Sequence, residues 1–280
     1  MKKILVPCDF SDTAIHAFKL AVEIAAKSKA EVMVLHAIEF MPAYETAFVA
    51  QPYAFDSSGA EEMQHEAEKN FEVMMAKCGD ASLPIKFVTE HGSVTNTIRK
   101  FIDTQEADLV VMGTHGANGL KEFLIGSNTE KIVRYSHVPV LALKSPTSIS
   151  SIQNIVFPTL PDLHQVNFVL KLKQLQQFLN AKLHILYVNT PIHLTPEKDI
   201  RRALEDYATH YQLSNYTLNM INGATEESGI INFTREINAD MIAMATHSRK
   251  AFAHFISGSI AEDVVNHVDC PIWTYTLKTS

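Results

Sequence analysis

The chain repeats itself, and this repeat constrains its fold more than any other feature of the sequence. The segment 3–7, Lys-Ile-Leu-Val-Pro, returns as Asn-Ile-Val-Phe-Pro at 154–158, an offset of 151 residues. The apolar segment 107–112 returns at 239–244, where the offset is 132. The 280 residues therefore predict two copies of one domain-sized unit. The fall in offset from 151 to 132 means that the second copy lacks 19 residues between its second and fourth strands.

Within the first copy, short β-rich runs alternate with amphipathic segments. The expected strands lie near residues 2–7, 31–37, 85–89, 108–112 and 138–143. The helical patterns lie between them, at 13–28, 60–77, 94–104 and 128–135. Such alternation predicts βαβ units, and hence an α/β fold with a doubly wound parallel sheet covered by helices on both faces. We place the two domains at residues 1–146 and 151–280, joined by a short polar linker.

Composition narrows the classes of function. The net charge of −7 gives no general attraction to nucleic acid or to an anionic membrane. No apolar run approaches the roughly 20 residues that span a bilayer, and the start of the chain fits a strand rather than a signal peptide. Three widely spaced cysteines indicate a reducing compartment without a disulfide framework. We therefore expect a cytoplasmic protein with no nucleic-acid or membrane partner.

Two glycine-containing segments fall where a parallel sheet binds its ligands. Gly-Thr-His-Gly at 113–116 follows the fourth expected strand, and Gly-Ser-Asn at 126–128 opens the last helix of the first copy. Glycine lets a backbone approach a ligand closely, and a helix N-terminus attracts phosphate. Asp9 follows the first strand and reaches the same edge of the sheet. A carboxylate there is suited to accept hydrogen bonds from a ribose or from an adenine amino group.

These features together resemble the universal stress protein family. The resemblance rests on Val-Pro-Cys-Asp-Phe-Ser at 6–11, on the Gly-x2-Gly-x9-Gly-Ser pattern from Gly113, and on the closing strand at 138–141. With the repeat, it covers nearly the whole chain and is similar to the tandem members of that family. It implies an adenine nucleotide alpha hydrolase-like fold, with five parallel strands in the order 3-2-1-4-5 in each domain. It also implies that the two copies pair through their last strands as an intrachain pseudo-dimer, with a homodimer of whole chains left open.

The resemblance further implies an ATP site in the first copy, with AMP or ADP as alternatives and Mg²⁺ arriving only with the nucleotide. Asp9 and Ala37 would flank adenosine, and the glycine segments would hold phosphates. No metal site of the protein's own is expected. The complete set of expected binding residues is Pro7, Cys8, Asp9, Ala37, Met112, Gly113, His115, Gly116, Gly126, Ser127 and Asn128.

Some of these residues also have explanations without a ligand. Ser127-x-x-Glu130 fits a capping box, as does Ser259-x-x-Glu262, and the loop glycines also suit ordinary turns. Cys8 and His36 suit packed positions at the ends of strands. Residues 40–59, rich in aromatics and proline, suit either a flap over the site or a satellite hydrophobic cluster.

The second copy separates helix capping from ligand binding as explanations. It keeps the glycine and serine of the helix start but loses the other residues expected at the site. At the matching positions it has Ala245 for Gly113, Ser248 for Gly116 and Ile260 for Asn128. In addition, Thr-Leu stands where Cys8-Asp9 stand in the first copy. We therefore expect the second copy to keep the fold and to bind ATP poorly or not at all.

Enzyme signatures are missing from the sequence. It contains neither a Gly-x4-Gly-Lys-Ser/Thr P-loop nor a Rossmann Gly-x-Gly-x-x-Gly segment. A non-catalytic, nucleotide-binding stress sensor is therefore the first hypothesis. A slow ATPase or self-phosphorylating protein using the same pocket is the second, and a scaffold without nucleotide is the third.

Overall fold

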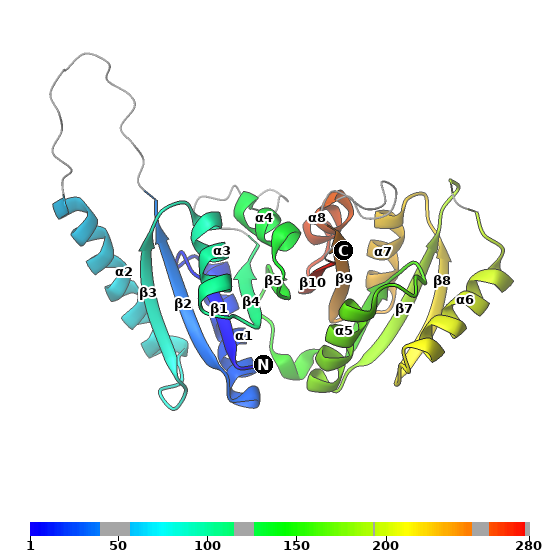
Figure 1. Ribbon diagram of the computed structural model, residues 1–280, viewed down its shortest axis with the longest axis horizontal. Coiled ribbons are helices and arrows are strands. Elements are labelled where there is room, and N and C mark those ends of the chain that lie inside the picture. Colours follow the sequence, from blue (N-terminus) through cyan, green and yellow to red (C-terminus); the bar gives the residue numbers. More distant parts are fainter. Residues whose placement is uncertain (40–56, 115–125, 193, 248–257, 278–280) are drawn as a thin grey trace, which may run out of the picture.

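The computed structural model describes residues 1–39, 57–114, 126–192, 194–247 and 258–277 (Figure 1). Its described strands form one ten-stranded sheet in the order β3-β2-β1-β4-β5-β10-β9-β6-β7-β8. The strands of the first half are β1 (Lys3–Pro7), β2 (Glu31–Ile38), β3 (Ile85–His91), β4 (Leu109–Gly113) and β5 (Val140–Leu143). Those of the second half are β6 (Asn154–Pro158), β7 (Lys182–Asn189), β8 (Tyr216–Asn222), β9 (Met241–His247) and β10 (Ile272–Leu277).

Helices connect the strands as the sequence patterns predict. Those of the first half are α1 (Asp12–Ser28), α2 (Ser57–Cys78), α3 (Val94–Thr104) and α4 (Ser127–Tyr135). Those of the second half are α5 (Val166–Leu179), α6 (Glu197–His210), α7 (Glu226–Glu236) and α8 (Gly258–His267). The expected α/β fold with a parallel-dominated, doubly wound sheet is therefore confirmed.

The two halves meet at the middle of the sheet. β5 and β10 pair antiparallel, with Leu141 opposite Trp273, whereas the paired strands within each half run parallel. A short 3-10 turn, Ile149–Ser151, lies between the halves along the chain. The glutamate Glu23 of α1 fastens this turn, because its Oε2 accepts from the Ser148 hydroxyl and the Ile149 amide, both at 2.8 Å.

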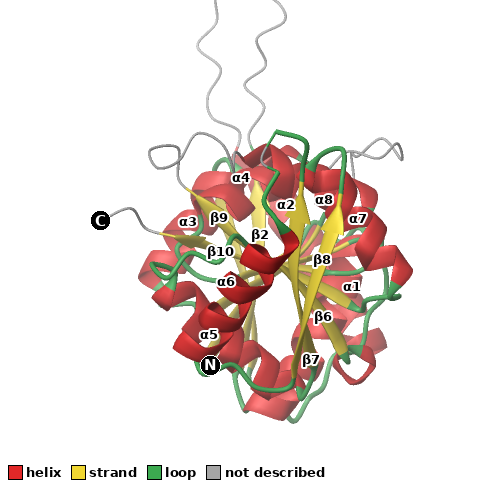
Figure 2. Cartoon of the chain, turned by 90° about the vertical axis from the view of Figure 1, so that its right-hand side faces the viewer, coloured by secondary structure: helices red, strands yellow, loops and turns green. Residues whose placement is uncertain are grey.

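The strands divide their side chains between two helical layers, which lie on either side of the strands in Figure 2. Ile4 and Val6 of β1 join a hydrophobic cluster with α1, and Leu5 between them joins a different cluster with α3 and α4. This alternation follows from the two-residue period of a strand. The cluster beneath α1 continues through Trp273 into the second half, so one core joins both halves on that face.

The 19 residues missing from the second half have two sources. Eighteen residues separate β2 from α2, but only seven separate β7 from α6. In addition, α2 has 22 residues and α6 has 14. The first half therefore carries a longer connection at the carboxyl edge of its sheet, and the flap expected in 40–59 lies mostly in residues 40–56, outside the described part of the chain.

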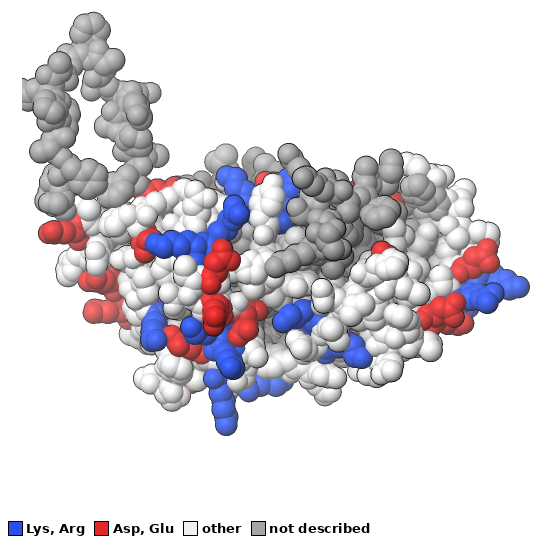
Figure 3. Space-filling model, viewed as in Figure 1, with Lys and Arg blue, Asp and Glu red and all other residues white. Residues whose placement is uncertain are grey.

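The surface is of mixed charge on the face drawn in Figure 3, where basic and acidic side chains are interspersed. Among the helices that the structure describes, none combines the length and the apolar composition needed to cross a membrane.

Candidate functional site

A cavity of about 420 Å³ opens at the carboxyl ends of β1, β2 and β4, beside the first turns of α3 and α4. Its volume lies within the range of about 300–1,000 Å³ that is usual for small-molecule sites. Nine of the eleven residues expected at the site line it: Pro7, Cys8, Asp9, Ala37, Met112, Gly113, Gly126, Ser127 and Asn128. The other two, His115 and Gly116, lie outside the described residues.

Asp9 lies at the cavity on a tight turn between β1 and α1. Its Oδ1 accepts from the amide of Ser11 at 3.1 Å and from the hydroxyl of Ser11 at 2.6 Å. The Ser11 Oγ in turn accepts from the amide of Ala14 and so caps α1. Phe10, between Asp9 and Ser11, has a φ of 63°, which an L-residue adopts only where its surroundings hold it. The turn therefore fixes a carboxylate at the edge of the cavity.

Gly113, the last residue of β4, is required by packing. A β-carbon at this position would lie 2.7 Å from Oγ1, 2.8 Å from Cβ and 2.9 Å from the backbone carbon of Thr13 in the first turn of α1. The carbonyl of Gly113 accepts from the Thr129 hydroxyl at 2.9 Å, which ties β4 to α4. Close approach of α1 thus explains this glycine without a ligand, and the phosphate contact assigned to it stays a prediction.

The N-terminus of α4 opens onto the cavity. Its N-cap is Gly126, which has no side chain to accept from the first turn, and Ser127 is the first helical residue and is exposed. The interpretation of Ser127 as the N-cap of a capping box is therefore wrong. Because the first N–H groups of a helix have no partners within the helix, this uncapped end is suited to an anion. For α8, the side chains of Ser259 and Glu262 lie outside the described part of the chain.

Glu39 also lines the cavity, and the sequence reasoning missed it. Its Oε1 accepts from the amide of Val94 at 2.9 Å, at the start of α3, where Ser93 makes no side-chain capping bond. Next to it, the Thr95 hydroxyl donates to Oδ1 of Asn128 at 3.0 Å and joins α3 to α4. The rule that selected Asp9, an acidic residue just past a strand at the ligand edge, also applies to Glu39.

Cys8 and His36 are held by packing. Burial raises the pKa of the Cys8 thiol to about 12, so the thiol stays protonated and unreactive at neutral pH. The half-buried His36 ring lies 5.2 Å from the ring of Phe10, and its Nδ1 lies 2.8 Å from the carbonyl oxygen of Cys8. Since a carbonyl only accepts, Nδ1 carries the proton. Both residues line the cavity as structural elements of its wall.

The matching region of the second half is filled with hydrophobic side chains. Val188 replaces Ala37 and Ile260 replaces Asn128, and both belong to one buried cluster with Ile230 and Met244. At Ala245, the counterpart of Gly113, a side chain fits because seven residues separate β6 from α5, whereas four separate β1 from α1. The later start of α5 moves its first turn along the chain, which removes the close approach that α1 makes.

The fold and the cavity thus define a tandem α/β protein with a cavity at the sheet edge of its first half. The sequence model of the Universal stress protein family matches residues 1–144 and again 151–275, and the chain belongs to this family. A universal stress protein of Methanocaldococcus jannaschii is 35% identical over 151 residues, covering 52% of this chain and 83% of that protein. A second one from that organism is 30% identical over 157 residues, covering 52% and 97%.

Among solved structures, the chain is similar to a universal stress protein from Archaeoglobus fulgidus. The two agree with a TM-score of 0.75 at 20% identity, over 98% of each chain. Because the identity is low, this similarity supports the fold of the whole tandem chain. It agrees with the two family matches along the sequence.

Proposed function

We propose that the first half of this stress-response protein binds an adenine nucleotide, ATP foremost and AMP or ADP as alternatives, in the cavity at its sheet edge. One observation carries the proposal. A carboxylate held by its own turn and an uncapped helix N-terminus, expected from separate parts of the sequence, line the same cavity of ligand size. Asp9 would accept from the ribose or the adenine amino group, and the first turn of α4 would receive the phosphates.

Electrostatics shape how the phosphates are held. The described lining includes the acidic side chains of Asp9 and Glu39 and contains neither lysine nor arginine. The positive end of α4 is therefore the counter-charge that these residues offer. Among the described residues there is no group of three or more His, Cys, Asp or Glu side chains suited to hold a metal. Mg²⁺ would thus enter as part of a nucleotide complex, with the phosphates as its main ligands.

The two halves take unequal roles in this proposal. Residues 1–146 form the binding domain, and residues 151–280 form a domain whose matching region is packed with Val188 and Ile260. The pairing of β5 with β10 supports an intrachain pseudo-dimer, with association of whole chains still open.

Each cavity carboxylate already accepts a structural hydrogen bond, from Ser11 or from Val94. This favours a non-catalytic sensor over a slow ATPase or self-phosphorylating protein. The cytoplasm is the location that we propose for it.

Isothermal titration of ATP into the wild type and Asp9→Asn tests the binding site. The amide can still accept from Ser11, so the turn is kept while the charge is lost. A hydrogen bond to a charged group contributes about 1.5–3 kcal/mol, so affinity should fall about tenfold to a hundredfold. Asp162→Asn is the matched control, because Oδ1 of Asp162 accepts from the His164 amide two residues later, at 2.9 Å, in the corresponding loop of the second half.

Equal loss of affinity in both variants, or none in Asp9→Asn, would refute the assignment of Asp9. Absence of ATP, ADP and AMP binding to the wild type would refute the nucleotide proposal and favour a scaffold. Incubation with γ-labelled ATP separates the remaining alternatives, because released or transferred label demonstrates catalysis and retained label supports the sensor.

A further inference from the structure

Helix α4 connects the cavity to the second half of the chain. Its first residues line the cavity, and the same helix packs against β9 and β10, across the middle of the sheet. In Figure 1, α4 lies above the junction where β5 and β10 meet. A helix of nine residues is only about two and a half turns long, and helices this short depend on their surroundings for stability. What holds the far end of α4 therefore bears on the end that faces the cavity.

Two threonines of the second half hold that far end. The Thr246 hydroxyl lies 3.2 Å and the Thr276 hydroxyl 3.5 Å from the carbonyl oxygen of Val133, and the two hydroxyls are 2.9 Å apart. Each hydroxyl has one proton, so the shorter distances define a chain in which Thr276 donates to Thr246 and Thr246 donates to Val133. The backbone is extended at Ser136, so the last-turn carbonyl of Val133 has no partner within α4.

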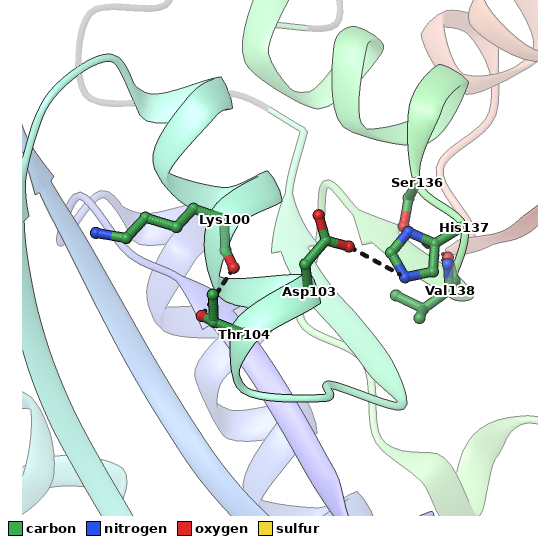
Figure 4. A network of polar contacts seen from close by, with 6 residues as sticks. All are labelled: Lys100, Asp103, Thr104, Ser136, His137 and Val138. Carbon is green, nitrogen blue, oxygen red and sulfur yellow. Dashed lines mark hydrogen bonds and ion pairs between the residues drawn. The ribbon is translucent and has the colours of Figure 1, made fainter.

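The first half holds the same end of α4 less firmly. His137, just past the helix, places its Nε2 3.4 Å from Oδ1 of Asp103 on α3 (Figure 4). Both side chains are exposed, at 41% and 68%, and exposed pairs of this kind contribute little. The threonines are 2% and 7% exposed, so the carbonyl that they satisfy cannot turn to water instead. Of these two contacts, the one from the second half is therefore the stronger.

The contact between the halves is reciprocal. Nζ of Lys144, at the end of the first half, donates to the carbonyl of Asn266 in the last turn of α8 at 2.6 Å. Burial lowers the pKa of this ammonium group. Lys144 occupies the position that matches Thr276. Each half thus contacts the C-terminal end of the other half's last helix, through the Thr246 and Thr276 hydroxyls at α4 and through the Lys144 ammonium group at α8.

We propose that Thr246, supported by Thr276, is a positioning residue for the nucleotide site, through which the second half sets the affinity of the first. The inference rests on the proposed function. Phosphate at the N-terminus of α4 and the hydroxyl cap at its C-terminus stabilise the same helical state. By linkage, the cap raises the fraction of chains competent to bind, and bound nucleotide strengthens the contact between the halves.

Variants of the full chain, compared by ATP titration, test this coupling. Thr246→Val removes the hydroxyl at nearly constant shape, and loss of one such hydrogen bond should weaken ATP binding about fivefold. Thr246→Ser keeps the hydroxyl and should restore wild-type affinity. Thr274→Val is the matched control, because this threonine of β10 is equally buried but its hydroxyl faces Val140 of β5. Lys144→Met, which uncaps α8, should also bind as the wild type does.

Equal affinities for Thr246→Val and Thr274→Val would overturn the inference while wild-type binding keeps the proposed function standing. Failure of the wild type to bind any adenine nucleotide would instead refute the proposed function, and this inference with it. Hydrogen exchange on the wild type needs no variant. Bound ATP should slow exchange in the last turn of α4 and in β10 of the second half, and unchanged exchange in β10 would overturn the coupling.

Discussion

At two matching positions, the larger side chain lies on the helix in the first half and on the strand in the second half. This difference can be tested directly. The first half has Ala37 on β2 and Thr97 on α3, and the second half has Val188 on β7 and Gly229 on α7. A β-carbon on Gly229 would lie 2.4 Å from Cγ1 and 3.0 Å from Cγ2 of Val188. The valine therefore requires the glycine. We predict that Ala37→Val with Thr97→Gly gives the cavity wall the packed form of the second half.

The contacts give the expected stabilities. By analogy with the contact between Val188 and Gly229, Ala37→Val alone should press the new methyl groups against Thr97, and such overpacking costs about 1–3 kcal/mol. Adding Thr97→Gly removes the collision. It loses some helix propensity and a buried methyl group, about 1 kcal/mol together, while the valine buries about 1.6 kcal/mol of new apolar groups. The double variant should thus unfold within about 1 kcal/mol of the wild type, and be more stable than Ala37→Val.

Urea unfolding and ATP titration measure the two consequences separately. Trp273, the single tryptophan, is 2% exposed at the junction of the halves and reports unfolding by its fluorescence. Both variants that carry Ala37→Val should bind ATP about fivefold to a hundredfold more weakly, since the larger side chain occupies space beside the proposed adenosine position and costs about 1–3 kcal/mol to accommodate. Thr97→Gly alone should still bind. If the folded double variant binds ATP with wild-type affinity, the idea that this valine closes the second half is refuted. If the effects of the two substitutions on the free energy of unfolding are additive, the packing argument is refuted.

Three further predictions concern single residues. Gly113→Ala should lower the free energy of unfolding by about 1–3 kcal/mol even without nucleotide, because its β-carbon meets Thr13, and unchanged thermal unfolding would contradict this. Cys8, with its pKa raised to about 12 by burial, should resist iodoacetamide at about pH 8 until the chain is unfolded, as mass spectrometry of the labelled peptide would show. Burial lowers the pKa of His184 below its ordinary value of about 6.5. The stability present above pH 6.5 should therefore be lost as the pH falls through 6.5 toward the pKa of His184 in the folded state. An NMR titration that gives a pKa at or above about 6.5 would contradict this prediction.

The sequence was sufficient for features that repeat or follow a local period. The offsets of 151 and 132 located both halves, and the structure divides the missing 19 residues between a shorter connection and a shorter α6. Strand and helix positions followed from alternating apolar patterns, which depend on neighbours a few residues apart. Asp9 was found because the carboxyl ends of parallel strands share one edge.

Features decided by contacts between distant segments were beyond the sequence patterns. Gly113 looked like a phosphate glycine, but Thr13, a hundred residues earlier, already excludes a side chain there. Ser127 looked like a cap because its spacing to Glu130 fits a capping box, yet the helix begins one residue earlier than that interpretation needs. The contact of Thr246 with the Val133 carbonyl joins residues 113 positions apart in different halves. No local pattern records such a pair.

The second half keeps a full five-stranded fold although its residues at the positions of Asp9 and Gly113 are altered, and the packing gives a reason. Where the first half leaves a cavity between β2, α3 and α4, the second half has the buried valine Val188 against Gly229, which replaces the cavity with core packing. That packing fixes β9 and β10, the two strands that carry Thr246 and Thr276 to α4. We expect a second open cavity to loosen these two strands. The packing that fills the matching region of the second half thus also supports the two strands that contact α4.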